Sequence, residues 1–152
     1  MTIRHFTASA LVFDAEGRVL LVFHRKAGVW LYPGGHLDDN EDPLAGAIRE
    51  TREETGVEAE PVDVPLFTHP AVVSYPRPFV VLEMDVRDSK VGEHRHIDPV
   101  YVLRAVTTAI SPQLEEVDAA RWVPVADVAS LPTPPELPAL VAAAAMWVKA
   151  QA

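Results

Sequence analysis

Three glutamates close together in the sequence could bind a divalent metal ion. Glu53 and Glu54 follow Glu50 by three and four residues, so in a helix all three lie on one side. Like charges at this spacing repel, and the C-terminal half of a helix disfavours anions, so the arrangement costs stability unless a cation lies beside it. Arg49 could pair with Glu53, but one guanidinium cannot neutralise three acids. Hard oxygen ligands favour Mg²⁺ or Mn²⁺ over Zn²⁺.

The alternative is a solvated acidic helix face without a function, because exposed charged helices are common. The residues before the helix argue against this alternative. Pro33, Gly34 and Gly35 allow the backbone to turn tightly and to approach a ligand closely. A Gly-Gly pair alone is weak evidence, but directly before an acidic helix it favours a binding site.

A helix over residues 43 to 55 must position these acids. Asp42 suits the N-cap, Pro43 suits the first helical position, and Gly56 suits the C-terminal stop. The other side of this helix is predicted to pack against the rest of the protein. Its residues are Leu44, Ile48, Thr51 and Thr55.

The stretch from 33 to 57 resembles the Nudix box, G-x5-E-x7-R-E-U-x-E-E-x-G-U, where U is an aliphatic residue. Gly35, Glu41 and the run RETREETGV over 49–57 match it, and the departure is Thr51 at an aliphatic position. Because Thr51 lies on the packing side of the helix, the departure concerns the core and not the chemistry.

The resemblance implies a fold and an organisation. It predicts an α/β protein of the Nudix type, with a single domain over residues 1–152. Its architecture would be an α/β/α sandwich, in which a mixed β-sheet lies between the box helix and a C-terminal helix.

The resemblance also implies a function, the metal-dependent hydrolysis of a phosphoanhydride bond. The substrate would be a nucleoside diphosphate linked to another moiety, of the nucleoside triphosphate, nucleotide sugar or ADP-ribose type. Mg²⁺ or Mn²⁺ would neutralise adjacent phosphates and help to deliver the nucleophile in line. The alternative is a non-catalytic Nudix-like module that binds a nucleotide-derived ligand. The complete set of charged box residues favours the enzyme.

Roles follow from the resemblance for individual residues. Arg49 would orient a neighbouring carboxylate while it pairs with Glu41. The metal ligands would be the Gly35 carbonyl, Glu50, Glu53 and Glu54.

The general base is predicted to be either a box glutamate or an acid that precedes Trp122. The box residue is Glu53. Of the three upstream acids, Glu115, Glu116 and Asp118, we favour Glu116. The predicted catalytic set is therefore Arg49, Glu53 and Glu116.

Four residues outside the box are predicted to contact the substrate. Arg25, in a basic turn, could meet phosphate oxygens, although an exposed turn would need no function. Trp30 precedes the Pro-Gly-Gly turn and could stack a base, as could Tyr32, Phe79 or Tyr101. His94 and His96 form an HxHxD pattern with Asp98, which could donate hydrogen bonds to a phosphate, bind a further metal ion, or belong to a plain polar loop.

Apolar patterns outline the remaining elements. Two apolar runs, 6–13 and 18–23, flank an acidic turn and predict a β-hairpin that is covered on both faces. Residues 79–86 and 101–108 predict two more strands, joined by a polar loop of some twelve residues at the rim of the site. Residues 136–150 predict a helix that packs against the sheet.

Composition excludes several classes of function. With no cysteine among 152 residues, disulfides, cysteine zinc sites and a thiol nucleophile are excluded. A net charge of −9 argues against nucleic acid and membrane partners, and agrees with a small anionic nucleotide that a metal ion bridges to the protein. The N-terminus lacks a long apolar core. We expect a cytoplasmic protein that is a monomer or homodimer.

Overall fold

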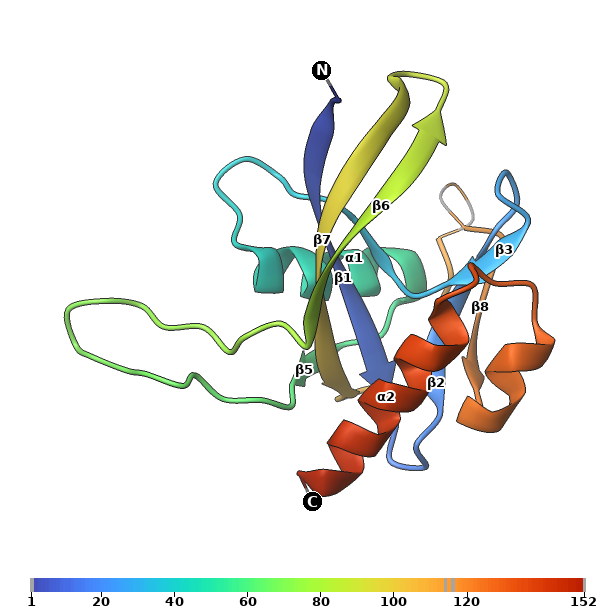
Figure 1. Ribbon diagram of the computed structural model, residues 1–152. Helices are drawn as coiled ribbons and strands as arrows, with labels where there is room; N and C mark the ends of the chain where they lie inside the picture. The colour runs from blue at the N-terminus through green and yellow to red at the C-terminus, as the bar shows by residue number, and fades with distance from the viewer. Residues whose placement is uncertain (1, 114, 116, 152) are drawn as a thin grey trace.

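The computed structural model describes residues 2–113, 115 and 117–151 of the chain. Within these residues, eight strands form one mixed sheet and two α-helices cover it (Figure 1). The helices are α1 (Pro43–Thr55) and α2 (Leu137–Ala150), and a short 3-10 helix, η1 (Val125–Ser130), precedes α2. The strands are β1 (Arg4–Phe13), β2 (Val19–His24), β3 (Val29–Leu31), β4 (Gly34–His36), β5 (Ala59–Pro61), β6 (Val80–Asp88), β7 (Gly92–Ala105) and β8 (Ala119–Val123).

Strand β1 is central in this sheet. It pairs antiparallel with β2, which confirms the predicted hairpin, and the turn between them is held by Asp14, whose Oδ1 accepts a hydrogen bond from Arg18 N at 2.8 Å. It also pairs antiparallel with β4, where Thr7 lies opposite His36. Its third partner, β7, runs parallel, with His5 opposite His96. Residues from three distant parts of the chain therefore lie side by side.

The sheet separates two hydrophobic layers, one beneath each helix. On β1, Leu11 belongs to the layer under α2, whereas Ala10 and Val12 belong to the layer under α1, as the two-residue period of a strand requires. Val141 of α2 and Ala47 of α1 are fully buried in these layers. The predicted α/β/α sandwich is confirmed. Neither helix of the described chain is long and apolar enough to cross a bilayer.

Helix α1 begins and ends as its sequence predicts. The Asp42 side chain accepts a hydrogen bond from Ala45 N at 2.8 Å, and Gly56 adopts a left-handed conformation with φ of 77°. Thr51, the departure from the box pattern, is fully buried, and its hydroxyl donates to Ala47 O at 2.8 Å. The polar atom at this packing position is therefore satisfied within the helix.

The prediction of a polar loop of some twelve residues between two strands is wrong. The turn between β6 and β7 covers only residues 89–91, and β7 already begins at Gly92, opposite Asp88. His94, His96 and Asp98 are strand residues, and their spacing of two places them on one face of the sheet. The sequence resembles a loop here because residues 92–98 are mostly polar, although His94 and Asp98 are buried.

Candidate active site

Strand β4 brings the glycine turn against the acidic half of α1. Gly34 N donates a hydrogen bond to Glu54 Oε1 at 2.9 Å. A Cβ atom on Gly35 would lie 2.7 Å from the carboxyl carbon of Glu50, closer than side-chain carbons approach one another. Only glycine leaves room for this carboxylate beside the backbone. The structure therefore brings the predicted ligands Gly35, Glu50 and Glu54 together.

Arg49 connects the acids of this site. Its Nε and Nη2 donate to the two carboxylate oxygens of Glu41 at 2.8 and 2.9 Å, and its Nη1 donates to Glu50 and Glu53 at 3.0 Å each. Asp38 lies 3.2 Å from Nε. The guanidinium fork thus positions Glu50 and Glu53 beside each other. It also makes the pairing with Glu41 that the box pattern predicts.

The site remains strongly acidic despite this arginine. Arg49 contacts four carboxylates, which leaves three negative charges uncompensated by it. Hydrogen bonds to Glu41 raise the pKa of Arg49, and the same contacts lower the pKa of Glu41, so both groups stay ionised. One guanidinium contacts more acids than the sequence suggested, but it does not neutralise them. Hard oxygen donors with excess negative charge fit a divalent cation such as Mg²⁺ or Mn²⁺.

Glu54 occupies a different environment from its neighbour Glu53. Glu54 is only 2% exposed, whereas the Glu53 side chain is 41% exposed. His24 Nε2 lies 3.9 Å from Glu54 Oε2, and burial lowers the pKa of His24 so that the ring is neutral at pH 7. The sequence placed all three glutamates on the side of α1 away from the core; the burial of Glu54 against β4 was not foreseen.

Three further predictions concern the alternative base, the basic turn and Trp30. Glu116 lies outside the described residues. Arg25 is 82% exposed, and its Nε donates to Asp118 Oδ2 at 3.0 Å. Trp30 packs against the ring of Phe23 with 5.3 Å between ring centroids, and the guanidinium of Arg121 lies 4.7 Å from its ring centre. These contacts do not test whether Arg25 and Trp30 bind the substrate, so both roles stay predictions.

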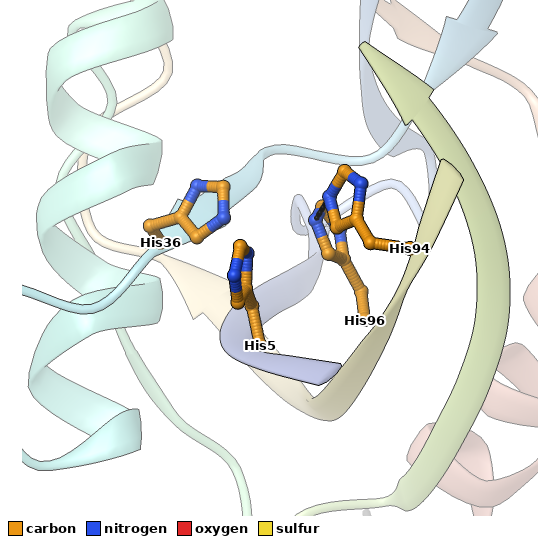
Figure 2. A group of neighbouring side chains, drawn as sticks. All are labelled: His5, His36, His94 and His96. Carbon is orange, nitrogen blue, oxygen red and sulfur yellow. Dashed lines mark hydrogen bonds between the residues drawn. The ribbon is translucent and has the colours of Figure 1, made fainter. Parts of the chain in front are cut away.

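His94 and His96 lie on the face of the sheet away from α1, among other imidazoles. His5 of β1 and His36 of β4 complete a group of four histidines, and one ring nitrogen from each lies within 4.8 Å of those of the other three (Figure 2). Burial, followed by the neighbouring imidazoles, lowers the pKa of His36 and lowers that of His96 to about 4. Sequence reasoning missed His5 and His36. The signal that could have identified His36 is its position directly after Gly35 in a strand, which directs its side chain to the opposite face.

Asp98, the third residue of the HxHxD pattern, belongs to a separate polar group. Its Oδ1 accepts hydrogen bonds from the hydroxyls of Thr7 and Ser9 at 2.9 Å each, and its Oδ2 accepts one from Tyr32 at 3.3 Å. Burial raises the pKa of this carboxyl despite the three donors. Asp98 therefore fixes the junction of β1, β7 and the turn before β4.

Comparisons with known proteins agree with this geometry. The NUDIX domain family matches residues 3–144. Nudix hydrolase 5 of Arabidopsis thaliana is 30% identical over 131 residues, which cover 81% of this chain and 37% of the relative. An isopentenyl-diphosphate Delta-isomerase of Clavibacter sepedonicus is 32% identical over 124 residues, which cover 69% of this chain and 65% of the relative.

A solved structure is similar over almost the whole chain. The structure of a NUDIX-family hydrolase from Clostridium perfringens superimposes with a TM-score of 0.76 at 25% identity, covering 95% of this chain and 98% of that one. The chain spans only 24% to 65% of the length of four curated relatives that it matches.

Proposed function

Because this chain belongs to the NUDIX domain family, we propose that it is a pyrophosphohydrolase with a single domain over residues 1–152. Its substrate would be a nucleoside diphosphate linked to another moiety. The observation that carries this proposal is the meeting of Glu50, Glu53 and Arg49 directly beside Gly35. A diphosphate needs charge neutralisation and a positioned water, and these residues supply ligands and a base for both.

Members of the family generally use a divalent metal ion, and we propose Mg²⁺ or Mn²⁺ for this chain. The ligands would be Glu50, Glu53, Glu54 and the carbonyl of Gly35. When bound, such an ion neutralises phosphate oxygens and stabilises the charge that develops on the leaving group. The donor set supports this choice because it contains carboxylate and carbonyl oxygens, which magnesium and manganese prefer.

The chain's own residues have distinct tasks in this proposal. Arg49 holds one oxygen each of Glu50 and Glu53 at 3.0 Å, so both carboxylates keep a fixed direction. Glu53, at 41% exposed, can accept a proton from a water molecule that attacks the diphosphate. Glu54 is buried and held by Gly34 N, which suits a ligand better than a base. Glu116 remains the second candidate for the base.

The similarity to an isopentenyl-diphosphate Delta-isomerase makes isomerisation of a diphosphate the competing activity. The sequence contains no cysteine, which argues against the cysteine-dependent isomerases of this superfamily. A module that binds a nucleotide without cleaving it is the second competitor. The complete set of charged residues around Arg49 favours an enzyme over such a module.

The test is a screen of a nucleotide panel with Mg²⁺ or Mn²⁺, in which the products are identified by mass. Nucleoside triphosphates, nucleotide sugars, ADP-ribose and dinucleoside polyphosphates should be compared, together with isopentenyl diphosphate. We expect a metal-dependent gain of one water in the sum of the product masses, and loss of turnover in Glu53→Gln. Tight nucleotide binding without a product would support the binding module. An isomer of unchanged mass would support the isomerase.

A further inference from the structure

We propose that His5, His36, His94 and His96 form a second metal site, which binds a divalent first-row transition ion of the zinc type. This inference is independent of the proposed hydrolase activity, because it concerns the other face of the sheet. Four imidazoles from three strands lie next to one another, and each offers one ring nitrogen to the group (Figure 2). Imidazole is a ligand that zinc, copper, nickel and iron favour, in contrast to the oxygen ligands beside α1.

The distances between the rings suit a single ion. Zinc bonds to histidine nitrogen are about 2.0 to 2.1 Å long, so the nitrogens around a tetrahedral ion lie about 3.3 Å apart. His94 Nε2 and His96 Nε2 are already 3.0 Å apart, and all four nitrogens lie within 4.8 Å of one another. A contraction of about 1.5 Å at the widest pair, achieved by side-chain rotation, would complete the site.

The sheet makes this arrangement rigid. His5 and His96 lie opposite each other in the parallel pair of β1 and β7, and His94 precedes His96 by two residues on the same face. His36 lies opposite Thr7 in the pair of β1 and β4. Binding sites on strands hold their ligands more precisely than sites on loops do. An ion here would therefore meet ligands whose backbones are already fixed.

Two further observations concern the ring nitrogens of His94 and His5. The Nδ1 of His94 lies 3.0 Å from the carbonyl oxygen of Gly92, to which it donates, so the lone pair is on Nε2, the nitrogen that faces His96. The Nδ1 of His5 is buried and has no hydrogen-bond partner among the described residues. Such an unsatisfied nitrogen is costly, and an ion bonded to it would satisfy it.

A carboxylate lies at the edge of the group. Asp88 Oδ2 is 3.6 Å from His94 Nε2, and its side chain is 39% exposed. Imidazole ligands bring no negative charge to a bound ion, so a neighbouring carboxylate stabilises its double charge. Asp88 supplies that charge without having to bind the ion.

The experiment titrates the metal-stripped chain of residues 1–152 with Co²⁺ in excess Mg²⁺, which is added to keep Co²⁺ from the carboxylates beside α1. Tetrahedral Co²⁺ absorbs strongly in the visible range, so binding and geometry are read together, and Zn²⁺ should displace it. We expect one Co²⁺ per chain. His36→Ala and His96→Ala should each weaken binding at least about 100-fold, because even residues that only support a ligand contribute 10- to 100-fold.

Three controls make the result decisive. His69→Ala removes a histidine outside the group and should bind Co²⁺ like the wild type, as should Glu53→Gln. X-ray absorption of the zinc-loaded wild type should show four nitrogen ligands at about 2.0 to 2.1 Å, and it decides the question if a variant fails to fold. Oxygen-dominated coordination, or unchanged affinity in folded His36→Ala and His96→Ala, would overturn the proposal.

Discussion

Two groups of potential metal ligands lie on opposite faces of β4, and the chain assembles them in different ways. The ligands of the first group come from one turn of α1 and from Gly35 of β4, so residues 35 to 54 contain the whole group. The imidazoles come from β1, β4 and β7, and residues 5 and 96 meet only because the strands pair. Gly35 and His36 are consecutive, yet each contributes to a different group because strand residues alternate between faces.

The two groups also differ in chemistry. Carboxylates that outnumber the arginine beside them attract small hard dications, whereas imidazoles favour transition ions. Strand β4 therefore carries ligands of both types, one on each of its two faces. Strand pairing can thus assemble a group of ligands that no single stretch of the sequence contains.

The largest effect should follow from removing a carboxylate on the α1 side. Glu54→Gln should lower metal-dependent turnover by about 10²- to 10⁴-fold, because its neutral amide binds Mg²⁺ poorly. Co²⁺ binding at the imidazoles should be unchanged, which would establish that the groups are separate. Steady-state kinetics and the Co²⁺ titration measure both properties. Glu58→Gln is the matched control, and equal turnover in both variants would contradict a role for Glu54.

Replacing Arg49 should destabilise the protein. Arg49→Ala removes the guanidinium partner of Glu41 and Glu50, whose side chains are each only 13% exposed. When a chelator removes metal ions, this change should lower the free energy of unfolding by about 3 kcal/mol. Adding Mg²⁺ should restore part of the loss, since the ion takes over the charge. Urea unfolding measures this. Arg52→Ala, on the exposed side of α1, should cost less than about 1 kcal/mol, and an equal loss in both variants would count against the network.

Sequence reasoning was strongest where local spacing fixes geometry. The helix period grouped the glutamates, the caps at Asp42 and Gly56 fixed the ends of α1, and apolar runs gave the first hairpin. It did not show that Glu54 would be buried, because β4 is what covers this residue. Burial depends on tertiary contacts, which a helical projection does not contain.

Prediction from the sequence was wrong where strands that are distant in the chain pair with each other. The strand over residues 92–98 was predicted to be a loop because its residues are polar, although every second residue lies on one face. The HxHxD pattern suggests metal ligands, but in the structure Asp98 bonds to Thr7 and not to the histidines. The neighbours of His94 and His96 are instead His5 and His36. The parallel pairing of β1 with β7 sets this partnership, and strand register is not encoded in local spacing.

The glycine between the two groups offers a more selective perturbation. Gly35→Ala would put a Cβ 2.7 Å from the carboxyl carbon of Glu50 and so displace the Glu50 carboxylate. A displacement of about 1 Å in an active site can lower turnover about 100-fold. The imidazoles should still bind Co²⁺. Gly17→Ala serves as control, since its Cβ meets no atom within 4 Å, although its φ of +80° adds strain. Kinetics near wild type in Gly35→Ala would show that Glu50 needs no such approach.

A smaller effect is expected at the edge of the imidazole group. Asp88→Asn removes a carboxylate 3.6 Å from His94 and should weaken Co²⁺ binding about 3- to 10-fold. This loss is smaller than the loss on removing a residue that supports a metal ligand in a buried site. Screening by water limits the effect because the side chain is partly exposed. Asp85→Asn, on the same hairpin and 87% exposed, should have no effect on the titration. Similar weakening by both changes would point to general surface charge.

The smallest effect should appear on the packing side of α1, where neither group lies. Thr51→Val replaces a buried hydroxyl that only donates to Ala47 O, so the free energy of unfolding should rise by up to about 1 kcal/mol. Thr55→Val is the matched comparison, because the Thr55 hydroxyl donates to Thr51 O and also accepts from Val57 N. Its loss leaves that buried amide unpaired and should cost about 1 to 3 kcal/mol. In urea unfolding, the free energy of unfolding should therefore rise in Thr51→Val and fall in Thr55→Val, and the turnover of Thr51→Val should be unchanged. Destabilisation of both variants would mean that α1 needs each hydroxyl to hold its carboxylates against β4.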